Sequence, residues 1–441
     1  MPDEKEVKNL DSMPTTKVQR ATKFMQTGVK IGGNYVKHYA KKLVDSNTTQ
    51  AELHANNAKD IYNALSELKG SALKVAQMMS MDRNLLPSAY QEKFTMAQYS
   101  APPLSYPLVV KTFASAFGKT PADFFDTFTK DAVNAASIGQ VHRATKDGQV
   151  FAVKVQYPGV ADSIASDLRI VKPFAVQLLG LTERDIDMYM TEVQGMLVAE
   201  TDYELELKNA VHIAAQCAHI PNLFFPRYYP EYSSKRILTM DWVPGQHLNE
   251  FLLTNPTQAV RNQLGQALWD FYDYQMHVMH MVHADPHPGN FLLQPDGTLG
   301  IIDFGCVKVI PEEYYKKHFR VISPSIFKDE ATLNQVFLDL QFIYEDDTPQ
   351  LKRLFTDLFS EMVELTIKPF RSGEFDFGSE DYFQQLYNFG ERLAKMDELK
   401  KSKKPRGSKD ALYLNRTYFG LYSMLNQLGA KISTKTSFDL A

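Results

Sequence analysis

The sequence predicts an α+β fold with two lobes, preceded by a helical extension. Before residue 245, strand-like alternation occurs in two places, at 150–156 and at 236–240. After residue 246, apolar residues recur at helical spacing almost to the end of the chain. A few strands followed by many helices are typical of a small mixed lobe joined to a largely helical C-terminal lobe. We therefore expect four regions: a basic amphipathic, partly disordered segment at 1–50, a helical extension at 51–130, the small mixed lobe at 131–245 and the helical large lobe at 246–441.

Composition and charge narrow the class of protein. The chain has 441 residues, of which 44% are hydrophobic and 23% are charged, as in an ordinary globular protein. Its formal net charge of -4 provides no overall basic field, so we expect no nucleic-acid partner. The two cysteines, Cys217 and Cys306, are too few for a disulfide framework and indicate a reducing compartment.

The N-terminal region bears on where the protein works. No stretch approaches the ~20 consecutive apolar residues of a membrane span, and residues 1–6 are acidic, unlike a signal or transit peptide. Residues 17–42 carry seven Lys or Arg side chains and no acid, with apolar residues between them. Such a segment is either a solvated helix packed on its own domain or a peripheral contact with anionic lipid. We expect a cytoplasmic protein, either free or peripheral at the inner face of a membrane.

One stretch carries most of the chemical information. Residues 283–290 read His-Ala-Asp-Pro-His-Pro-Gly-Asn, and Asp-Phe-Gly follows at 303–305, one hairpin's length later. The order and spacing of Asp285, Asn290 and Asp303 match the catalytic loop and metal loop of protein kinases. In phosphoryl transfer, Asp285 would take or orient the acceptor's proton, while Asn290 and Asp303 would bind magnesium. The set predicts a protein-kinase-like fold that binds ATP or ADP with Mg²⁺ between its two lobes.

Lys154 lies within the strand pattern Phe-Ala-Val-Lys-Val. A buried ammonium needs an acidic partner, because burying an unpaired charge is costly. Lys154 either grips the α and β phosphates and pairs with a helix glutamate, or points to solvent from an edge strand. With the later motifs in order, we predict the first. In the acidic stretch 200–206, which we expect on one helix, Glu206 is the favoured partner, with Glu200 and Asp202 nearby.

A string of small residues occupies the place of the glycine-rich phosphate loop of kinases. Only Gly139 remains, so the usual cradle of flexible backbone amides is altered. The expected hinge between the lobes lies at 240–245. The candidate nucleotide-contacting residues of the string and the hinge are Ala135, Ala136, Ser137, Ile138, Gly139, Gln140, Met240 and Val243.

His283 and His287 flank Asp285 at a spacing that could suggest a metal site. Pro286 and Pro288 preclude the regular helix that would bring two such histidines together, so we do not expect zinc. We expect His283 to brace the loop by hydrogen bonding and His287 to lie near substrate or phosphate.

Together these motifs resemble the UbiB/AarF family of atypical kinase-like proteins. The resemblance spans about residues 60 to 310, and the string at 416–422 is also similar. The matching segments are Lys69–Ser80, Leu85–Pro87, Ala101–Pro103, Ala135–His142, Val153–Val160, Glu200–Tyr203, His283–Asn290 and Asp303–Gly305.

The resemblance implies an N-terminal helical element with a Lys-x-Gly-Gln motif that folds over the active site and obstructs protein substrates. Lys74 and Gln77 fill this motif and are expected at the catalytic site, but its glycine is Ala76 here. The family's Glu-x-Asp motif, Glu200 and Asp202 here, is expected to meet that element. The family also implies ATPase or small-molecule kinase-like activity that supports isoprenoid quinone (ubiquinone) biosynthesis or lipid homeostasis, with a lipid or quinone precursor as ligand.

Three functions are compatible with these residues. The first is an ATPase or phosphotransferase, which the complete set of Asp285, Asn290 and Asp303 favours. The second is a nucleotide-gated scaffold for lipid-processing partners, in which turnover is incidental. The third is a small-molecule phosphotransferase of the aminoglycoside or choline kinase type, which shares the His-x-Asp-x-His-x-x-Asn loop but lacks the preceding helical element.

Overall fold

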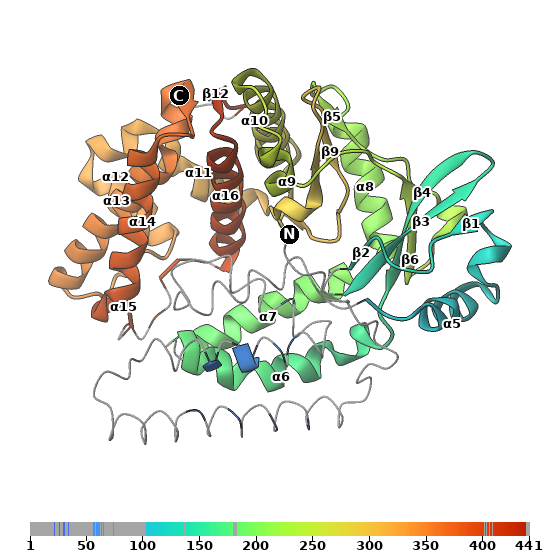
Figure 1. The fold of residues 1–441 in the computed structure, drawn as a ribbon. Helices are drawn as coiled ribbons and strands as arrows, with labels where there is room; N and C mark the ends of the chain where they lie inside the picture. Colours follow the sequence, from blue (N-terminus) through green and yellow to red (C-terminus); the bar gives the residue numbers. More distant parts are fainter. Residues whose placement is uncertain are drawn as a thin grey trace, which may run out of the picture. The chain divides into compact units, whose positions relative to one another are not determined.

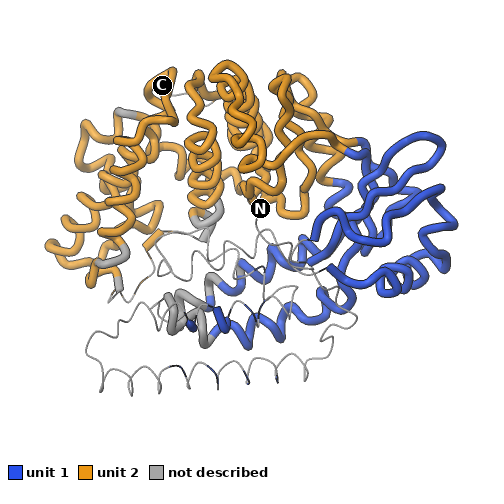
Figure 2. Tube along the Cα trace, in the orientation of Figure 1, with its two compact units in different colours: residues 1–208, 227–242 blue, residues 209–226, 243–441 orange. Residues whose placement is uncertain are grey.

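The computed structural model describes residues 103–135, 138–179, 183–400 and 409–437, together with isolated residues that include Lys74 and Arg406. The chain divides into two compact units (Figure 2). Unit 1 comprises residues 1–208 and 227–242, and unit 2 comprises residues 209–226 and 243–441.

Unit 1 contains a five-stranded sheet with the strand order β1-β3-β4-β6, in which β2 also pairs with β3 (Figure 1). Asp147 and Gly148 link β3 to β4 with positive φ angles of 50° and 76°, as a tight hairpin turn requires. The strands are β1 (Thr127–Phe128), β2 (Asn134–Ala135), β3 (Gly139–Lys146), β4 (Gln149–Gln156) and β6 (Ile237–Asp241).

Helices complete unit 1. Helix α5 (Tyr106–Phe117) contributes Phe113 to an apolar cluster with Phe151 and Val153 of β4, which anchors the helix to the sheet. Helices α6 (Val160–Leu179) and α7 (Glu183–Glu200) pack against each other. Helix α8 (Tyr203–Cys217) begins in unit 1 and continues into unit 2.

The short strands of unit 2 form three small sheets. Antiparallel pairs join β7 to β10, β8 to β9, and β11 to β12, and β5 runs parallel to β9. The strands are β5 (Leu223–Phe224), β7 (Met281–His283), β8 (Phe291–Leu293), β9 (Leu299–Ile301), β10 (Val307–Val309), β11 (Glu374–Asp376) and β12 (Lys431–Ser433).

Most of unit 2 is helical. Helices α10 and α16 lie side by side (Figure 1), and the rings of Trp269 and Tyr422 stack at a centroid distance of 6.5 Å. The helices are α9 (Leu248–Leu253), α10 (Gln258–Tyr274), α11 (Glu312–Phe319), α12 (Glu330–Asp339), α13 (Pro349–Ser372), α14 (Glu380–Lys395), α15 (Asp397–Lys400) and α16 (Lys409–Leu428). The predicted α+β class is confirmed. In the part of the chain that is described, no helix combines the length and apolar character needed to cross a membrane.

A buried histidine links three elements of unit 2. His277 lies in the π-helical turn η3 (Gln275–Met279), with Nδ1 2.9 Å from the Tyr315 hydroxyl and Nε2 3.4 Å from the Tyr418 hydroxyl. Burial lowers the pKa of His277 to about 4, despite the opposing attraction of Asp273. The imidazole is therefore neutral at neutral pH in the folded protein.

This shift predicts acid sensitivity. Between its ordinary pKa of 6.5 and about 4, the His277 ring binds a proton in the unfolded chain but not in the folded one. The free energy of unfolding should fall as the pH falls through this window, by about 1.4 kcal/mol per pH unit for this group. Urea denaturation at pH 7, 6 and 5 should show a shallower fall for His277→Gln than for the wild type. An equal fall in both proteins would contradict the assignment.

Candidate active site

Lys154 lies in β4, a central strand of the unit 1 sheet. Its register partners are Val141 on β3 and Leu238 on β6, which excludes the edge-strand alternative. Lys154 Nζ lies 3.0 and 3.1 Å from the two carboxylate oxygens of Glu206. The two side chains are only 10% and 0% exposed, so the pair places two opposite charges together out of water. Glu206, the partner favoured from the sequence, is therefore the acid that Lys154 contacts.

Tyr203 packs between this ion pair and the small-residue string. The ammonium of Lys154 lies 5.0 Å from the centre of the Tyr203 ring, and Tyr203 is fully buried. A Cβ atom at Gly139 would come within 2.7 Å of the Tyr203 hydroxyl and 2.8 Å of the Val155 carbonyl oxygen. The one glycine left in the string is thus required by close packing on Tyr203. Sequence reasoning gave Tyr203 no role, although it follows the Glu-x-Asp motif directly.

The rest of the small-residue string is partly described. Ala135 ends β2 and pairs with Gln140 in β3. The side-chain amide of Gln140 binds the backbone of Leu104, accepting at 2.7 Å and donating at 3.2 Å. Ile138 is buried. Hydrogen bonding therefore holds the Gln140 side chain to the segment that precedes α5. Two predicted nucleotide contacts lie outside the described residues: Ala136 and Ser137.

The acidic stretch at 200–206 is not one continuous helix, and that prediction is wrong. Helix α7 ends at Glu200, and α8 begins at Tyr203. Asp202 accepts a hydrogen bond from the Leu205 backbone N–H at 3.1 Å, as an N-cap residue does. Because an aspartate side chain competes with the backbone for these donors, it favours a new helix start over continuation of α7.

Glu200 makes a different contact from Asp202. Its carboxylate forms an ion pair with Lys74 at 3.0 Å, with side-chain exposures of 7% and 14%. The structure therefore brings together the lysine of one predicted motif and the glutamate of the other. Gln77 and Ala76 lie outside the described residues.

In unit 2, backbone pairing fixes the position of Asp285. The β7–β10 pairing continues one residue beyond β7, where the Ala284 N–H donates to the Cys306 carbonyl at 2.9 Å. Asp285 comes next in the chain, so it is held beside the Asp-Phe-Gly turn at 303–305. The two motifs that the sequence linked by order are therefore linked in space within this unit.

His283 braces this arrangement, as predicted. Its Nε2 lies 2.9 Å from the Asp303 carbonyl, and its Nδ1 lies 3.2 Å from the Tyr272 hydroxyl. Because a carbonyl can only accept, Nε2 carries the hydrogen and Nδ1 accepts from Tyr272. Burial lowers the pKa of His283, although the charges of Asp285 and Asp303 oppose the shift. His287 Nδ1 accepts from the backbone N–H of Gly289 at 2.9 Å and so caps the following turn.

Asn290 and Asp303, the predicted metal ligands, lie at the same end of the β8–β9 hairpin. The Ile302 N–H donates to the Asn290 carbonyl at 3.1 Å, which leaves the two side chains offset by one residue. The Asn290 Nδ2 donates to the Asp285 carbonyl at 2.9 Å, so its Oδ1 points the other way. Asp303 Oδ1 accepts from the Gly305 N–H at 3.0 Å.

This donor set fits a magnesium ion of the nucleotide-bound kind. Within the described ranges, no three His, Cys, Asp or Glu side chains are close enough together to hold a metal ion by themselves. Mg²⁺ in nucleotide sites takes one or two protein oxygens and completes its shell with phosphates and water. The Oδ1 of Asn290 and the carboxylate of Asp303 provide oxygens of this type.

Arg416 is, after Tyr203, a second residue of the candidate site that sequence reasoning missed. Its Nη2 lies 2.7 Å from Asp285 Oδ1, and the side chains are 17% and 9% exposed. The two residues are 131 positions apart, so no local pattern links them. The signal that did exist was the family-like string at 416–422, to which no role had been given.

Met240 and Val243 lie on either side of the boundary between the units. Met240 is buried in β6 of unit 1, opposite Ala152. Val243 is buried in unit 2, and a Cβ atom at Gly300 would come within 2.7 Å of its Cγ1. Their contact with a nucleotide stays a prediction.

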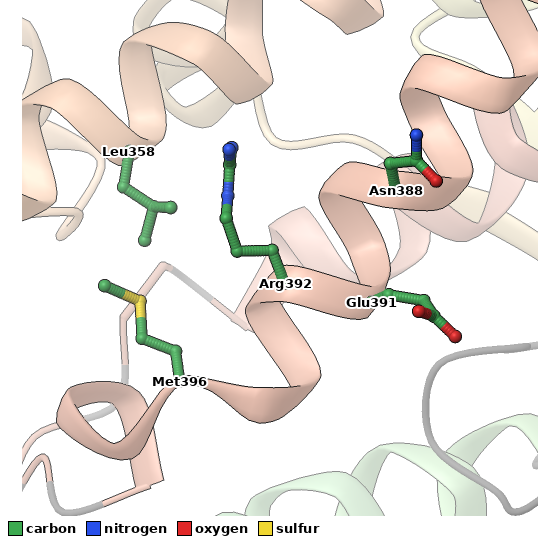
Figure 3. Close-up of a pocket in the computed structure, with 5 residues that line it drawn as sticks. All are labelled: Leu358, Asn388, Glu391, Arg392 and Met396. Carbon is green, nitrogen blue, oxygen red and sulfur yellow. The ribbon is translucent and has the colours of Figure 1, made fainter.

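Unit 2 also contains surface hollows away from these residues. One, of about 490 Å³, is bounded by α13 and the C-terminal half of α14 (Figure 3). The figure shows Leu358, Arg392 and Met396 converging on it, with Asn388 and Glu391 further along α14. A second hollow of similar size is lined by charged residues that include Asp347 and Arg406. None of the predicted site residues lines either hollow.

The fold and these residues define a protein-kinase-like protein. A solved structure titled as the complex of Rv3197 and erythromycin from Mycobacterium tuberculosis is similar, with a TM-score of 0.59 and 25% identity. The similarity covers 89% of this chain and 97% of that chain. The model of the ABC1 atypical kinase-like domain matches residues 96–337. The chain belongs to this family, which is also known as UbiB/AarF.

Curated relatives carry kinase names. The probable serine/threonine-protein kinase abkA of Dictyostelium discoideum is 24% identical over 97% of this chain and 79% of its own length. The mitochondrial atypical kinase COQ8B of Rattus norvegicus is 28% identical over 83% of this chain and 70% of its own length. An aarF domain-containing chloroplastic protein kinase of Arabidopsis thaliana is 28% identical over 78% of this chain. The match covers 49% of that protein, so this chain spans about half of its length.

The buried ion pair of unit 1 predicts an asymmetric response to mutation. Glu206→Gln leaves the Lys154 ammonium buried without its carboxylate, which should lower the free energy of unfolding by about 3 kcal/mol. The double variant Lys154→Met/Glu206→Leu removes both charges, so its free energy of unfolding should fall by less than that of Glu206→Gln. Urea denaturation of the three proteins checks this order. Equal losses in the single and double variants would show that charge pairing is not what Glu206 contributes.

Proposed function

We propose that this protein binds Mg-ATP and hydrolyses it or transfers its γ-phosphoryl group to a small acceptor. The observation that carries the proposal is the fixed group of Asp285, Asn290 and Asp303, which His283 and the β7–β10 and β8–β9 pairings hold in place. An aspartate, an asparagine and a second aspartate in this order along the chain are the residues that kinases use for phosphoryl transfer.

Each residue has a distinct role in this proposal. Lys154 binds the α and β phosphates, and Glu206 holds the ammonium in place for them. Asp285 orients the attacking hydroxyl or water through its carboxylate. Asn290 and Asp303 hold the cation through oxygen atoms. When bound, Mg²⁺ neutralises charge on the phosphates during transfer.

The biological setting is also part of the proposal. Two relatives carry the name COQ8B, which associates them with coenzyme Q, at 25% to 28% identity. We infer that this chain supports isoprenoid quinone biosynthesis or membrane lipid homeostasis, with a lipid or quinone precursor as ligand and an anionic membrane surface as partner. The basic segment at 17–42, which would contact such a surface, lies outside the described residues except for Thr22, Gln26, Lys30 and Asn34.

A nucleotide-gated scaffold is the second candidate. The ion pair between Lys74 and Glu200 favours it, because an N-terminal residue is tied to the end of α7 in the unit that carries Lys154. In this case nucleotide binding would change the contact, and turnover would be incidental.

The test is ATP hydrolysis by purified protein in the presence of Mg²⁺, with and without liposomes of phosphatidylcholine and phosphatidylglycerol. Asp303→Asn should lower kcat by about a hundredfold or more, because it removes a charged oxygen ligand at the phosphates. Asp296→Asn, in the exposed turn of the same β8–β9 hairpin, is the matched control and should keep wild-type activity.

The outcomes separate the two candidates. Liposome-stimulated hydrolysis that Asp303→Asn lacks supports the enzyme. Binding of Mg-ATP without hydrolysis in either condition supports the scaffold. Wild-type turnover by Asp303→Asn would overturn the assignment of this aspartate.

A further inference from the structure

Helix α16 meets the catalytic loop at two points one helical turn apart. Arg416 reaches the Asp285 carboxylate, with Nη2 2.7 Å from Oδ1. Gly420 lies against the next residue of the loop, where an added Cβ atom would come within 2.2 Å of Pro286 Cγ and 2.7 Å of its Cβ. Residues four apart share a helix face, so one face of α16 holds both Asp285 and Pro286. The glycine allows the helix to approach closely enough for the arginine to reach.

Burial of Asp285 makes its contact with Arg416 important for the stability of the charged carboxylate. Asp285 is 6% exposed, and a carboxylate that is removed from water needs a compensating partner. The fully buried Tyr272 lies near the pair, and burial, together with the charge of Asp285, raises the pKa of its hydroxyl well above the usual value, while Arg416 opposes this shift. Tyr272 is therefore neutral, and the Arg416 guanidinium is a cation in direct contact with Asp285.

We propose that Arg416 is the positioning residue of the catalytic loop, which fixes the rotation of the Asp285 carboxylate and so the direction in which it presents an oxygen to the acceptor. This inference rests on the function proposed above. By holding Oδ1, the guanidinium sets where Oδ2 faces, since the two oxygens rotate together about the Cβ–Cγ bond. The Asn290 Nδ2 lies 3.4 Å from Oδ2, a longer contact than the 2.7 Å between Arg416 and Oδ1. Arg416 acts through Asp285 and binds neither nucleotide nor acceptor.

The first test separates turnover from binding. Arg416→Met keeps an unbranched apolar stem and removes the guanidinium and its charge, and it should lower kcat by about a hundredfold, the effect of a misplaced reacting group. The dissociation constant for Mg-ADP should stay within about twofold, because the arginine does not touch the nucleotide. Arg416→Lys should recover at least half of the lost activity on a logarithmic scale, since a lysine ammonium can also donate to the Asp285 carboxylate that Arg416 Nη2 contacts. A parallel loss of nucleotide affinity, or no loss of kcat, would overturn the proposal.

Two further variants address the helix itself. Asn426→Ala removes another anchor of α16, the bond from its Nδ2 to the Phe377 carbonyl at 2.8 Å, and should leave kcat unchanged. Gly420→Ala forces α16 away from Pro286 and should lower kcat as Arg416→Met does. If Asn426→Ala reproduces the effect of Arg416→Met, the arginine contributes only to the general stability of α16.

A double-mutant cycle tests whether Arg416 acts through Asp285. Once Asp285→Asn has removed the charge, adding Arg416→Met should change kcat by no more than about twofold, although Arg416→Met alone changes it about a hundredfold. Independent effects that multiply in the double variant would contradict the proposal.

Hydrogen–deuterium exchange gives a readout that does not need turnover. Peptides that cover residues 283–290 should exchange faster in Arg416→Met and in Asp285→Asn, with no further increase in the double variant. Peptides of the unit 1 sheet should not change. Unchanged exchange at 283–290 would overturn the positioning role even if the wild type hydrolyses ATP. Faster exchange in a protein without turnover would support the contact and count against the proposed enzyme.

Discussion

Buried charge is the constraint on which the candidate site depends. The proposed function gives Lys154 a role at the phosphates and Asp285 a role at the acceptor, and both residues are nearly inaccessible to water. A buried charge is stable only beside an opposite charge or several hydrogen bonds. Glu206 supplies this for Lys154 in unit 1, and Arg416 supplies it for Asp285 in unit 2. In each unit, a residue of a helix distant in sequence therefore holds one buried charged side chain in place: Glu206 of α8 holds Lys154, and Arg416 of α16 holds Asp285.

The sequence predicts the residues whose chemistry is encoded locally. The spacing of Asp285, Asn290 and Asp303 reflects a loop and a hairpin, whose geometry is determined over about twenty residues. Lys154 is identifiable because a charged residue in an apolar strand needs a partner, and the structure shows Glu206 as a partner of it. His283 could be assigned as a brace because Pro286 and Pro288 exclude a helical role. In all these positions the short-range pattern and the final structure agree.

Some features of the structure could not be predicted from short-range sequence patterns. The run at 200–206 has helical spacing throughout, but Asp202 caps a new helix, since hydrogen bonding by its side chain outweighs the propensity of its neighbours. Arg416 illustrates a different difficulty. It is an ordinary arginine on an amphipathic helix until the chain folds and brings it to Asp285, and such a pairing depends on packing between α16 and the loop rather than on periodicity. Tyr203 is similar, because only the close approach of Gly139 reveals its position.

The contact of α16 extends the candidate site beyond the matched domain. The match to the ABC1 domain model stops at residue 337, before α13 begins. Yet the helix at 409–428 contributes both the cation that faces Asp285 and the glycine that lets Pro286 approach. A boundary drawn after residue 337 would keep the motif residues and remove the group that orients one of them. The surroundings of the loop therefore depend on α16 as well as on the matched domain, because Arg416 contributes to the charge balance and to the orientation of the buried Asp285 carboxylate.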